Sequence, residues 1–136
     1  MIAERLYHLA ETNNWFSNLQ ADFRKGHSCM DQIIRLSQAI EDGFQRKSMN
    51  HAVKVLLDYS KAFDTVWLSR LLLSMADKVV PLEYVKWINS FLLNRQASVR
   101  LHGTTSSSSR KLQQGMSQGC VLSPLLFLCF INNFAE

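Results

Sequence analysis

The stretch LLDYSKAFD, residues 56–64, decides the fold that this sequence predicts. Its first two residues are the last two of a short aliphatic run, residues 52–57. This run is interrupted only by Lys54, as expected of a strand covered on both faces. Asp58 would then stand at the carboxyl end of that strand, where an uncompensated charge is costly. A bound Mg²⁺ would compensate this charge because hard cations take carboxylate oxygens. The alternative is that Asp58 only caps a turn.

Two helices are predicted after this stretch. Asp64 or Thr65 can cap the first, and capping is a more ordinary role for Asp64 than metal binding. Pro81 suits the first position of the second helix, which would run to about Asn94. Each helix has one apolar side, formed by Trp67, Leu68, Leu71, Leu72 and Met75 in the first and by Tyr84, Ile88, Phe91 and Leu92 in the second.

Two further helices are predicted upstream. Residues 1–13 are compatible with a helix. Between residues 29 and 44 apolar side chains recur at spacings of three and four, so one face should pack and the helix should end near Gly43. The run FRKGH, residues 23–27, lies between these helices and places two cations beside a glycine. Such a cluster can hold phosphates, although a solvated basic loop is an equal alternative.

The remaining sequence predicts a hairpin, a turn and a buried helix. Residues 97–102 alternate as a strand does, and a serine-rich connection leads to a partner strand at 111–113. In the run GMSQGCVLSP, residues 115–124, two glycines permit a sharp turn and close approach to a ligand. Ser123 would be the N-cap of the helix and Pro124 would lie in its first turn; a simple tight turn before a helix is the alternative. This order of elements favours an α+β architecture.

Composition sets only broad limits. The 136 residues fit one domain, and the 47% apolar content is enough for an ordinary core. Fifteen Lys and Arg against eleven Asp and Glu permit a polyanionic partner without indicating one. The three cysteines form neither a zinc-type pair nor a complete disulfide framework, which fits a reducing compartment. Because no signal peptide or membrane span is predicted, we expect a protein of the nucleus or cytoplasm that is not secreted and has no membrane partner.

Taken in order, four blocks of this sequence resemble the reverse transcriptase domain of non-LTR, LINE-type retrotransposons, particularly the jockey-like group. The blocks are QADFRKGHSCMDQI from Gln20, VLLDYSKAFDTVW from Val55, WINSFLLNRQASVR from Trp87 and LQQGMSQGCVLSPLLF from Leu112. The resemblance implies a partial right-hand polymerase fold. Residues from 1 to about 50 would be fingers-like and residues from about 51 to 136 part of the palm, with a connecting helix and hairpin between about 87 and 113.

The resemblance also implies an activity and its residues. The family adds deoxynucleotides to a primer on an RNA template, and its cofactor is Mg²⁺. By this resemblance Asp58 binds both catalytic metal ions with help from the carbonyl group of Tyr59. Phe63 would exclude a 2′ hydroxyl group as a steric gate. Gln118 and Gly119 would line the incoming nucleotide.

The same resemblance assigns Arg24 and Lys25 to the fingers, where they would touch template or triphosphate. The sequence departs from the family pattern at Asp22, where glycine is usual, and at Ser117, where proline is usual. The paired-aspartate strand of the family is not among the 136 residues. We therefore expect a polymerase fragment that is inactive alone. The alternative is a non-catalytic retrotransposon remnant with residual nucleic-acid binding; a magnesium-dependent phosphatase is disfavoured because Ser60 stands where a second acidic residue belongs.

Overall fold

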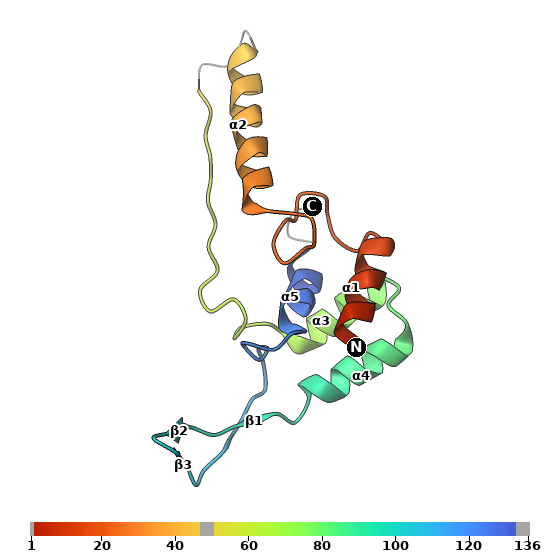
Figure 1. Cartoon of the computed structure of the whole chain (residues 1–136), viewed down its shortest axis with the longest axis vertical. Helices are drawn as coiled ribbons and strands as arrows, with labels where there is room; N and C mark the ends of the chain where they lie inside the picture. The colour runs from red at the N-terminus through yellow and green to blue at the C-terminus, as the bar shows by residue number, and fades with distance from the viewer. Residues whose placement is uncertain (1, 47–50, 133–136) are drawn as a thin grey trace.

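The computed structural model describes residues 2–46 and 51–132. Its helices are α1 (Ile2–Thr12), α2 (Cys29–Gln45), α3 (Leu68–Asp77), α4 (Leu82–Leu92) and α5 (Ser123–Ile131) (Figure 1). Its strands are β1 (Gln96–Ala97), β2 (Arg100–Leu101), β3 (Thr104–Thr105) and β4 (Arg110–Lys111). Helices combined with small antiparallel sheets confirm the predicted α+β class. In the described ranges no helix has the length and apolar character needed to cross a bilayer.

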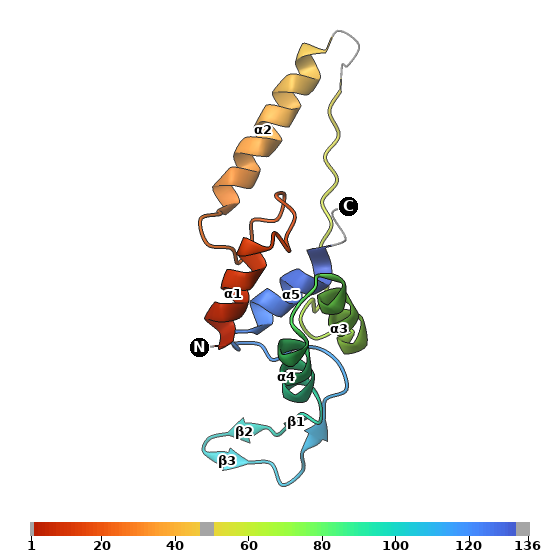
Figure 2. The same ribbon diagram turned by 90° about the vertical axis from the view of Figure 1, so that its right-hand side faces the viewer.

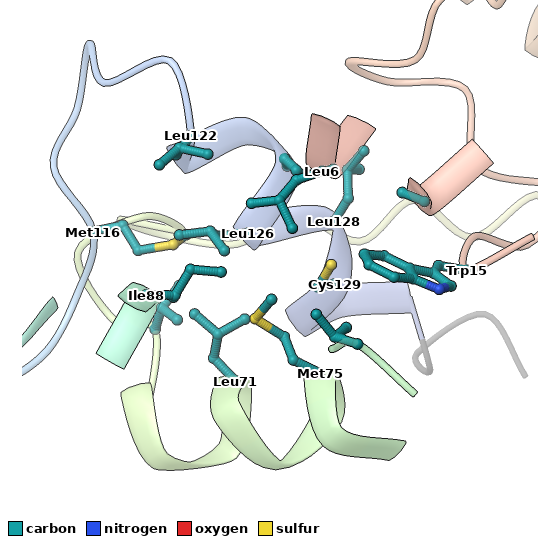
Figure 3. Packing of buried hydrophobic residues seen from close by; sticks show 14 of the residues in the cluster. Leu6, Trp15, Leu71, Met75, Ile88, Met116, Leu122, Leu126, Leu128 and Cys129 are labelled. Atoms are coloured by element: carbon teal, nitrogen blue, oxygen red, sulfur yellow. The ribbon is translucent and has the colours of Figure 1, made fainter. Parts of the chain in front are cut away.

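Helices α1, α3, α4 and α5 pack around one apolar core and form the helical base of the molecule (Figures 1 and 2). Helix α5 is apolar on nearly every side, so burial is the stable solution for it. Figure 3 shows Leu126 of α5 facing Leu71 and Met75 of α3. The Ser74 hydroxyl group donates a hydrogen bond to the Cys129 carbonyl oxygen at 2.7 Å, so this buried polar side chain at the α3–α5 contact is satisfied.

The N-terminal helix belongs to the base. Leu6 of α1 is fully buried, and Trp15 and Phe16 are buried directly after the helix. The Ser17 backbone N–H donates a hydrogen bond to the side-chain oxygen of Asn132 at 2.7 Å, which joins the loop after α1 to the residue that follows α5. Residues before and after position 50 therefore share one core.

Helix α2 starts as predicted but does not pack. The Ser28 hydroxyl oxygen accepts a hydrogen bond from the Asp31 N–H, and the Asp31 carboxylate accepts one from the Ser28 N–H, which is a capping box. The helix continues past Gly43 to Gln45. The expected packing of one face is wrong: no residue of α2 is buried, and its exposed large apolar side chains are Met30, Ile33, Ile34 and Phe44.

Residues 52–58, which we call the extended segment, do not form the predicted strand. Their backbone runs extended beside α2, as both views show, and every one of them is exposed (Figures 1 and 2). A strand needs a neighbour for its backbone N–H and C=O groups. The four described strands pair only among themselves. The expectation of a strand covered on both faces is therefore wrong, and α2 and the extended segment together form a projecting arm.

The predicted caps of the next helices are also corrected. At the N-cap position of α3 stands Trp67, whose side chain makes no capping hydrogen bond. The Thr65 hydroxyl group instead donates to the Lys61 carbonyl oxygen at 3.2 Å within the preceding turn, so neither Asp64 nor Thr65 caps the helix. Pro81 occupies the N-cap position of α4 rather than its first turn.

The predicted hairpin is present, but it is split into two short ladders. Its turn lies at His102 and Gly103, whose φ angles of 47° and 82° are those of a two-residue turn that matches the twist of paired strands. The chain therefore reverses before the serine-rich run and not within it. The paired residues are Gln96 with Lys111, Ala97 with Arg110, Arg100 with Thr105 and Leu101 with Thr104.

Candidate nucleotide-binding site

Two segments that lie far apart in the sequence are joined at the edge of the helical base. The Gly115 N–H donates a hydrogen bond to the Val66 carbonyl oxygen at 2.9 Å, and the Met116 N–H donates to the Phe63 carbonyl oxygen at 2.8 Å. Met116 also buries its side chain in the core. These contacts set the turn at residues 115–119 directly against the turn that follows the extended segment.

Gly115 is required by this close approach. Its φ of +79° is a conformation that other residues adopt at a cost. A Cβ atom at this position would also lie 2.5 Å from the backbone oxygen of Asp64, so neither the angle nor the space admits a side chain. The sequence predicted that this glycine allows close approach to a ligand, whereas in the structure the group that it approaches is the chain's own Asp64 backbone.

Two side chains hold the turn in place. The Arg95 guanidinium group donates to the Leu92 carbonyl oxygen at 2.9 Å and to the Gly115 carbonyl oxygen at 2.5 Å, which ties the end of α4 to the turn. The Ser123 hydroxyl group donates to the Ser117 carbonyl oxygen at 2.6 Å. Ser123 is the first residue of α5, whose N-cap position is Leu122, so its predicted capping role is wrong. No pattern in the sequence pointed to Arg95.

Gln118 and Asp64 contact each other across the two turns. The Gln118 side-chain amide donates to a carboxylate oxygen of Asp64 at 3.1 Å, although 54 positions separate these residues. Asp64 thus has a partner in the turn instead of the helix end that the sequence suggested. This contact orients the Gln118 amide with respect to the Phe63 turn.

An open pocket of about 460 Å³ lies between the two turns. Phe63 forms part of its wall, and its ring is fixed by stacking on Phe127 (4.8 Å between ring centres) and by an edge contact with Phe23 (6.4 Å). The structure therefore brings together three predicted nucleotide-binding residues, Phe63, Gln118 and Gly119. The full lining is Phe23, Lys61, Ala62, Phe63, Gln118, Gly119, Cys120, Val121, Ser123 and Pro124.

Asp58 is not part of this lining. It is exposed at the end of the extended segment, while Tyr59 lines an adjacent pocket that shares Ala62. Within residues 2–46 and 51–132, no three His, Cys, Asp or Glu side chains gather as a metal site would require. One exposed carboxylate supplies only a fraction of the roughly six oxygen ligands of Mg²⁺. The described residues therefore do not form a complete metal site by themselves.

Arg24 and Lys25, predicted together as phosphate ligands, lie in different surroundings. The Arg24 side chain is 8% exposed and makes a two-pronged ion pair with the Glu11 carboxylate at 2.8 and 3.0 Å. It also donates to the carbonyl oxygens of Ser17 and Gln20. Lys25 is exposed. The structure thus gives Arg24 a role in holding its own loop and leaves Lys25 accessible to solvent.

These features define an α+β protein with a glycine-containing turn and an aromatic wall around an open pocket. Comparison with known families carries the assignment further. The family described as "Reverse transcriptase (RNA-dependent DNA polymerase)" matches residues 1–136. This chain belongs to that family, which confirms the resemblance seen in the sequence.

Named relatives come from fruit flies. The chain is 35% identical over 130 residues to the "Probable RNA-directed DNA polymerase from transposon BS" of Drosophila melanogaster, which covers 96% of this chain. It is 29% identical to the polymerases of the X-element and of the mobile element jockey from the same species, over 100% and 98% of this chain. In each case the chain spans 14% of the relative's length. No solved structure is significantly similar to the chain.

Proposed function

We propose that this chain forms the nucleotide-binding part of an RNA-directed DNA polymerase, acting on an RNA template, a DNA primer and deoxynucleoside triphosphates. One observation supports this most directly: Phe63 and Gln118, distant in sequence, line the same pocket. A pocket with a few polar groups on an otherwise apolar wall is the usual form of a small-molecule site. In this proposal residues from 1 to about 50 belong to the fingers and the rest to part of the palm.

Three pocket residues, together with Lys25 outside the pocket lining, contact the nucleotide in this proposal. The Phe63 ring packs under the deoxyribose and excludes a 2′ hydroxyl group, and the ring has little freedom to move because Phe127 stacks on it. Gln118, oriented by Asp64, and the backbone of Gly119 contact the sugar and phosphates. Lys25 neutralises a phosphate of template or triphosphate. A rigid Phe63 ring is needed in this proposal, because a wall that discriminates deoxyribonucleotides from ribonucleotides must keep its position.

The metal centre in this proposal takes Asp58 and the carbonyl oxygen of Tyr59 as ligands for Mg²⁺. When bound, such ions would supply activation of the primer hydroxyl group and charge stabilisation for the leaving pyrophosphate. Because a single carboxylate cannot hold two ions, and the 136 residues contain no Asp-Asp pair, the chain by itself should not polymerise.

Primer extension on an RNA template tests the proposal. The 136-residue chain should give no product, whereas a chimera with this chain in place of the matching segment of the transposon BS polymerase should extend the primer. Asp58→Asn in the chimera should abolish extension, because the amide replaces a charged metal ligand. Robust extension by the 136-residue chain, or by the Asp58→Asn chimera, would refute the roles given to these residues.

The steric gate has its own test in the same chimera. Phe63→Ala should raise the use of ribonucleotides relative to deoxynucleotides by about tenfold or more, equivalent to ~1.4 kcal/mol of lost discrimination. Phe23→Ala is the matched control, since Phe23 lines the same pocket and touches Phe63 only by an edge contact. Equal relaxation by both variants would mean that pocket loosening, and not a gate, controls selection.

A second candidate function is nucleic-acid binding without catalysis, and the hairpin favours it. Between residues 95 and 111 there is no Asp or Glu, and Arg100, Arg110 and Lys111 are exposed. Each cation that contacts a phosphate releases counterions, so binding to an RNA–DNA duplex should weaken as salt rises. The variant Arg110→Ser with Lys111→Ser should lower the slope of that salt dependence by roughly 1–2. A slope unchanged by the double variant would exclude this surface.

A further inference from the structure

Arg95 lies where three parts of the chain meet. It stands between the end of α4 and the start of β1. Its backbone carbonyl oxygen accepts a hydrogen bond from the Leu112 N–H at 2.9 Å, at the root of the hairpin. Its guanidinium group donates through Nε to the Leu92 carbonyl oxygen at 2.9 Å and through Nη2 to the Gly115 carbonyl oxygen at 2.5 Å. The backbone and the side chain of Arg95 are thus both held in place.

The Gly115 oxygen belongs to a peptide group that is hydrogen-bonded on both sides. The same planar group carries the Met116 N–H, which donates to the Phe63 carbonyl oxygen at 2.8 Å. In a trans peptide the C=O and N–H bonds point in opposite directions, so Arg95 and the Phe63 backbone lie on opposite sides of one rigid unit. A donor at the oxygen also polarises the N–H and strengthens its hydrogen bond.

This peptide group lies between two residues that line the nucleotide pocket, Phe63 and Gln118. The Met116 side chain is anchored in the core beside Leu126 (Figure 3). The two hydrogen bonds of the peptide group therefore set how it is turned about this anchor. If the group turned, it would release the Phe63 carbonyl oxygen and let the Phe63 wall move away from Gln118.

Arg95 does not line this pocket itself, but it lines two adjoining ones. It can therefore act on the pocket only through the backbone that it holds. Arginine suits this task because its rigid, planar guanidinium group presents several N–H donors in fixed directions, whereas the lysine ammonium group is a single point of charge.

We infer that Arg95 is a positioning residue that sets the sugar specificity of the nucleotide pocket. It holds the Gly115–Met116 peptide group, and this group keeps the Phe63 wall at a constant distance from Gln118. The specificity role rests on the proposed polymerase function, whereas the positioning role does not.

Hydrogen exchange of the Met116 amide in the 136-residue chain tests the positioning role. Relative to the slowest amides of the helical base, Arg95→Ala should speed this exchange by at least about tenfold, and Arg95→Lys should speed it less because one of the two hydrogen bonds can be kept. Ser74→Ala is the matched control, since it also removes a hydrogen bond to a buried residue's carbonyl oxygen, that of Cys129, but away from the pocket. The positioning role would be overturned if the relative exchange of Met116 were the same in Arg95→Ala and Ser74→Ala.

Nucleotide selection by the transposon BS chimera tests the specificity role. Arg95→Ala should raise the ratio of kcat/KM for ribonucleotides to that for deoxynucleotides by roughly threefold to tenfold, and Ser74→Ala should leave the ratio unchanged. Because Arg95 acts through Phe63, adding Arg95→Ala to Phe63→Ala should change the ratio by no more than about twofold. A loss of selection of the same size with and without Phe63, or no loss in either background, would overturn the specificity role.

The two measurements separate this inference from the proposed function. An unsubstituted chimera that fails to extend the primer would refute the proposed function and the specificity role with it. The exchange of the Met116 amide would then still decide whether Arg95 positions the peptide group. An active chimera with normal selection in Arg95→Ala would instead overturn the specificity role and leave the proposed function in place.

Discussion

The helical base and the projecting arm contain similar apolar side chains in opposite environments. In the base, Leu71 and Leu126 are fully buried, whereas in the arm Ile34 of α2 is 60% exposed and Leu56 is 78% exposed. This difference in burial comes from the elements that surround each side chain and not from the type of side chain. Helix α5 fills the centre of the base and gives every facing helix an apolar surface, but no described element covers the arm. Apolar patterning therefore indicates a face that can be buried, and a second segment decides whether it is.

The largest effect should come from removing a side chain of the base. Leu71→Ala should lower the free energy of unfolding by about 2–5 kcal/mol, because it creates a cavity at the α3–α5 contact. Ile34→Ala in the arm should change it by no more than about 0.5 kcal/mol. Urea denaturation followed by tryptophan fluorescence measures both. Similar losses from the two variants would show that the arm is packed in solution.

The next effect concerns the turn that borders the pocket. Gly115→Ala should cost about 2–4 kcal/mol, from the strained φ and from overlap with the Asp64 backbone. Gly103→Ala in the hairpin has a similar φ of +82° but meets no atom within 4 Å, so it should cost only about 1–2 kcal/mol. Thermal unfolding measures the stability of both variants, and the difference between their losses is the part due to the close approach of Gly115 to the Asp64 backbone. Equal losses of stability in the two variants would mean that the Gly115 turn does not contact the turn that contains Asp64.

A smaller effect is expected where the loop before α2 meets the base. Arg24→Ala should cost about 1–3 kcal/mol, since it removes the ion pair with Glu11 and the hydrogen bonds to the carbonyl oxygens of Ser17 and Gln20. The adjacent Lys25→Ala should change stability by less than about 0.5 kcal/mol. Chemical denaturation distinguishes them, and a neutral Arg24→Ala would contradict the inward position of its side chain.

The ion pair between Arg24 and Glu11 also predicts that the stability of the chain depends on pH. Hydrogen bonds from Arg24 hold the pKa of Glu11 below its ordinary value of 4.5. The folded chain therefore binds this proton less readily than the unfolded chain, so the stabilisation is present above about pH 4.5 and is lost as the pH falls through the lowered pKa. Glu11→Gln should remove this component from a stability profile between pH 3 and 6. A profile that Glu11→Gln leaves unaltered would argue against the ion pair.

The smallest effect should be local. Ser28→Ala removes the capping box of α2 and should reduce the stability of that helix by about 1 kcal/mol. Because no residue of α2 is buried, the loss should appear as faster hydrogen exchange of α2 amides with no change in the unfolding of the base. A shift in global unfolding of the same size would show that the arm and the base unfold together.

Much of the candidate site was predictable, but the contacts within it were not. The motifs around Phe63 and Gln118 were recognised through family resemblance, and the glycine at position 115 indicated a close approach. The role of Arg95 had no signal, because a lone arginine between a helix and a strand usually points into solvent. The contact between Asp64 and Gln118 joins two distant turns, and single-segment rules such as helix capping led to a different expectation for Asp64.

By itself the sequence determined the features that depend on near neighbours in the chain: the positions of α1, α2 and α5 to within a few residues, the hairpin, and the family blocks. Helix periodicity, the Ser28 capping box and turn glycines act over a few residues and can be read locally. Only the tertiary structure decided that no residue of α2 is buried, that residues 52–57 have no ladder partner among the described residues and that Arg24 turns inward to Glu11. Burial and strand pairing belong to two segments at once, so one segment read alone does not determine them.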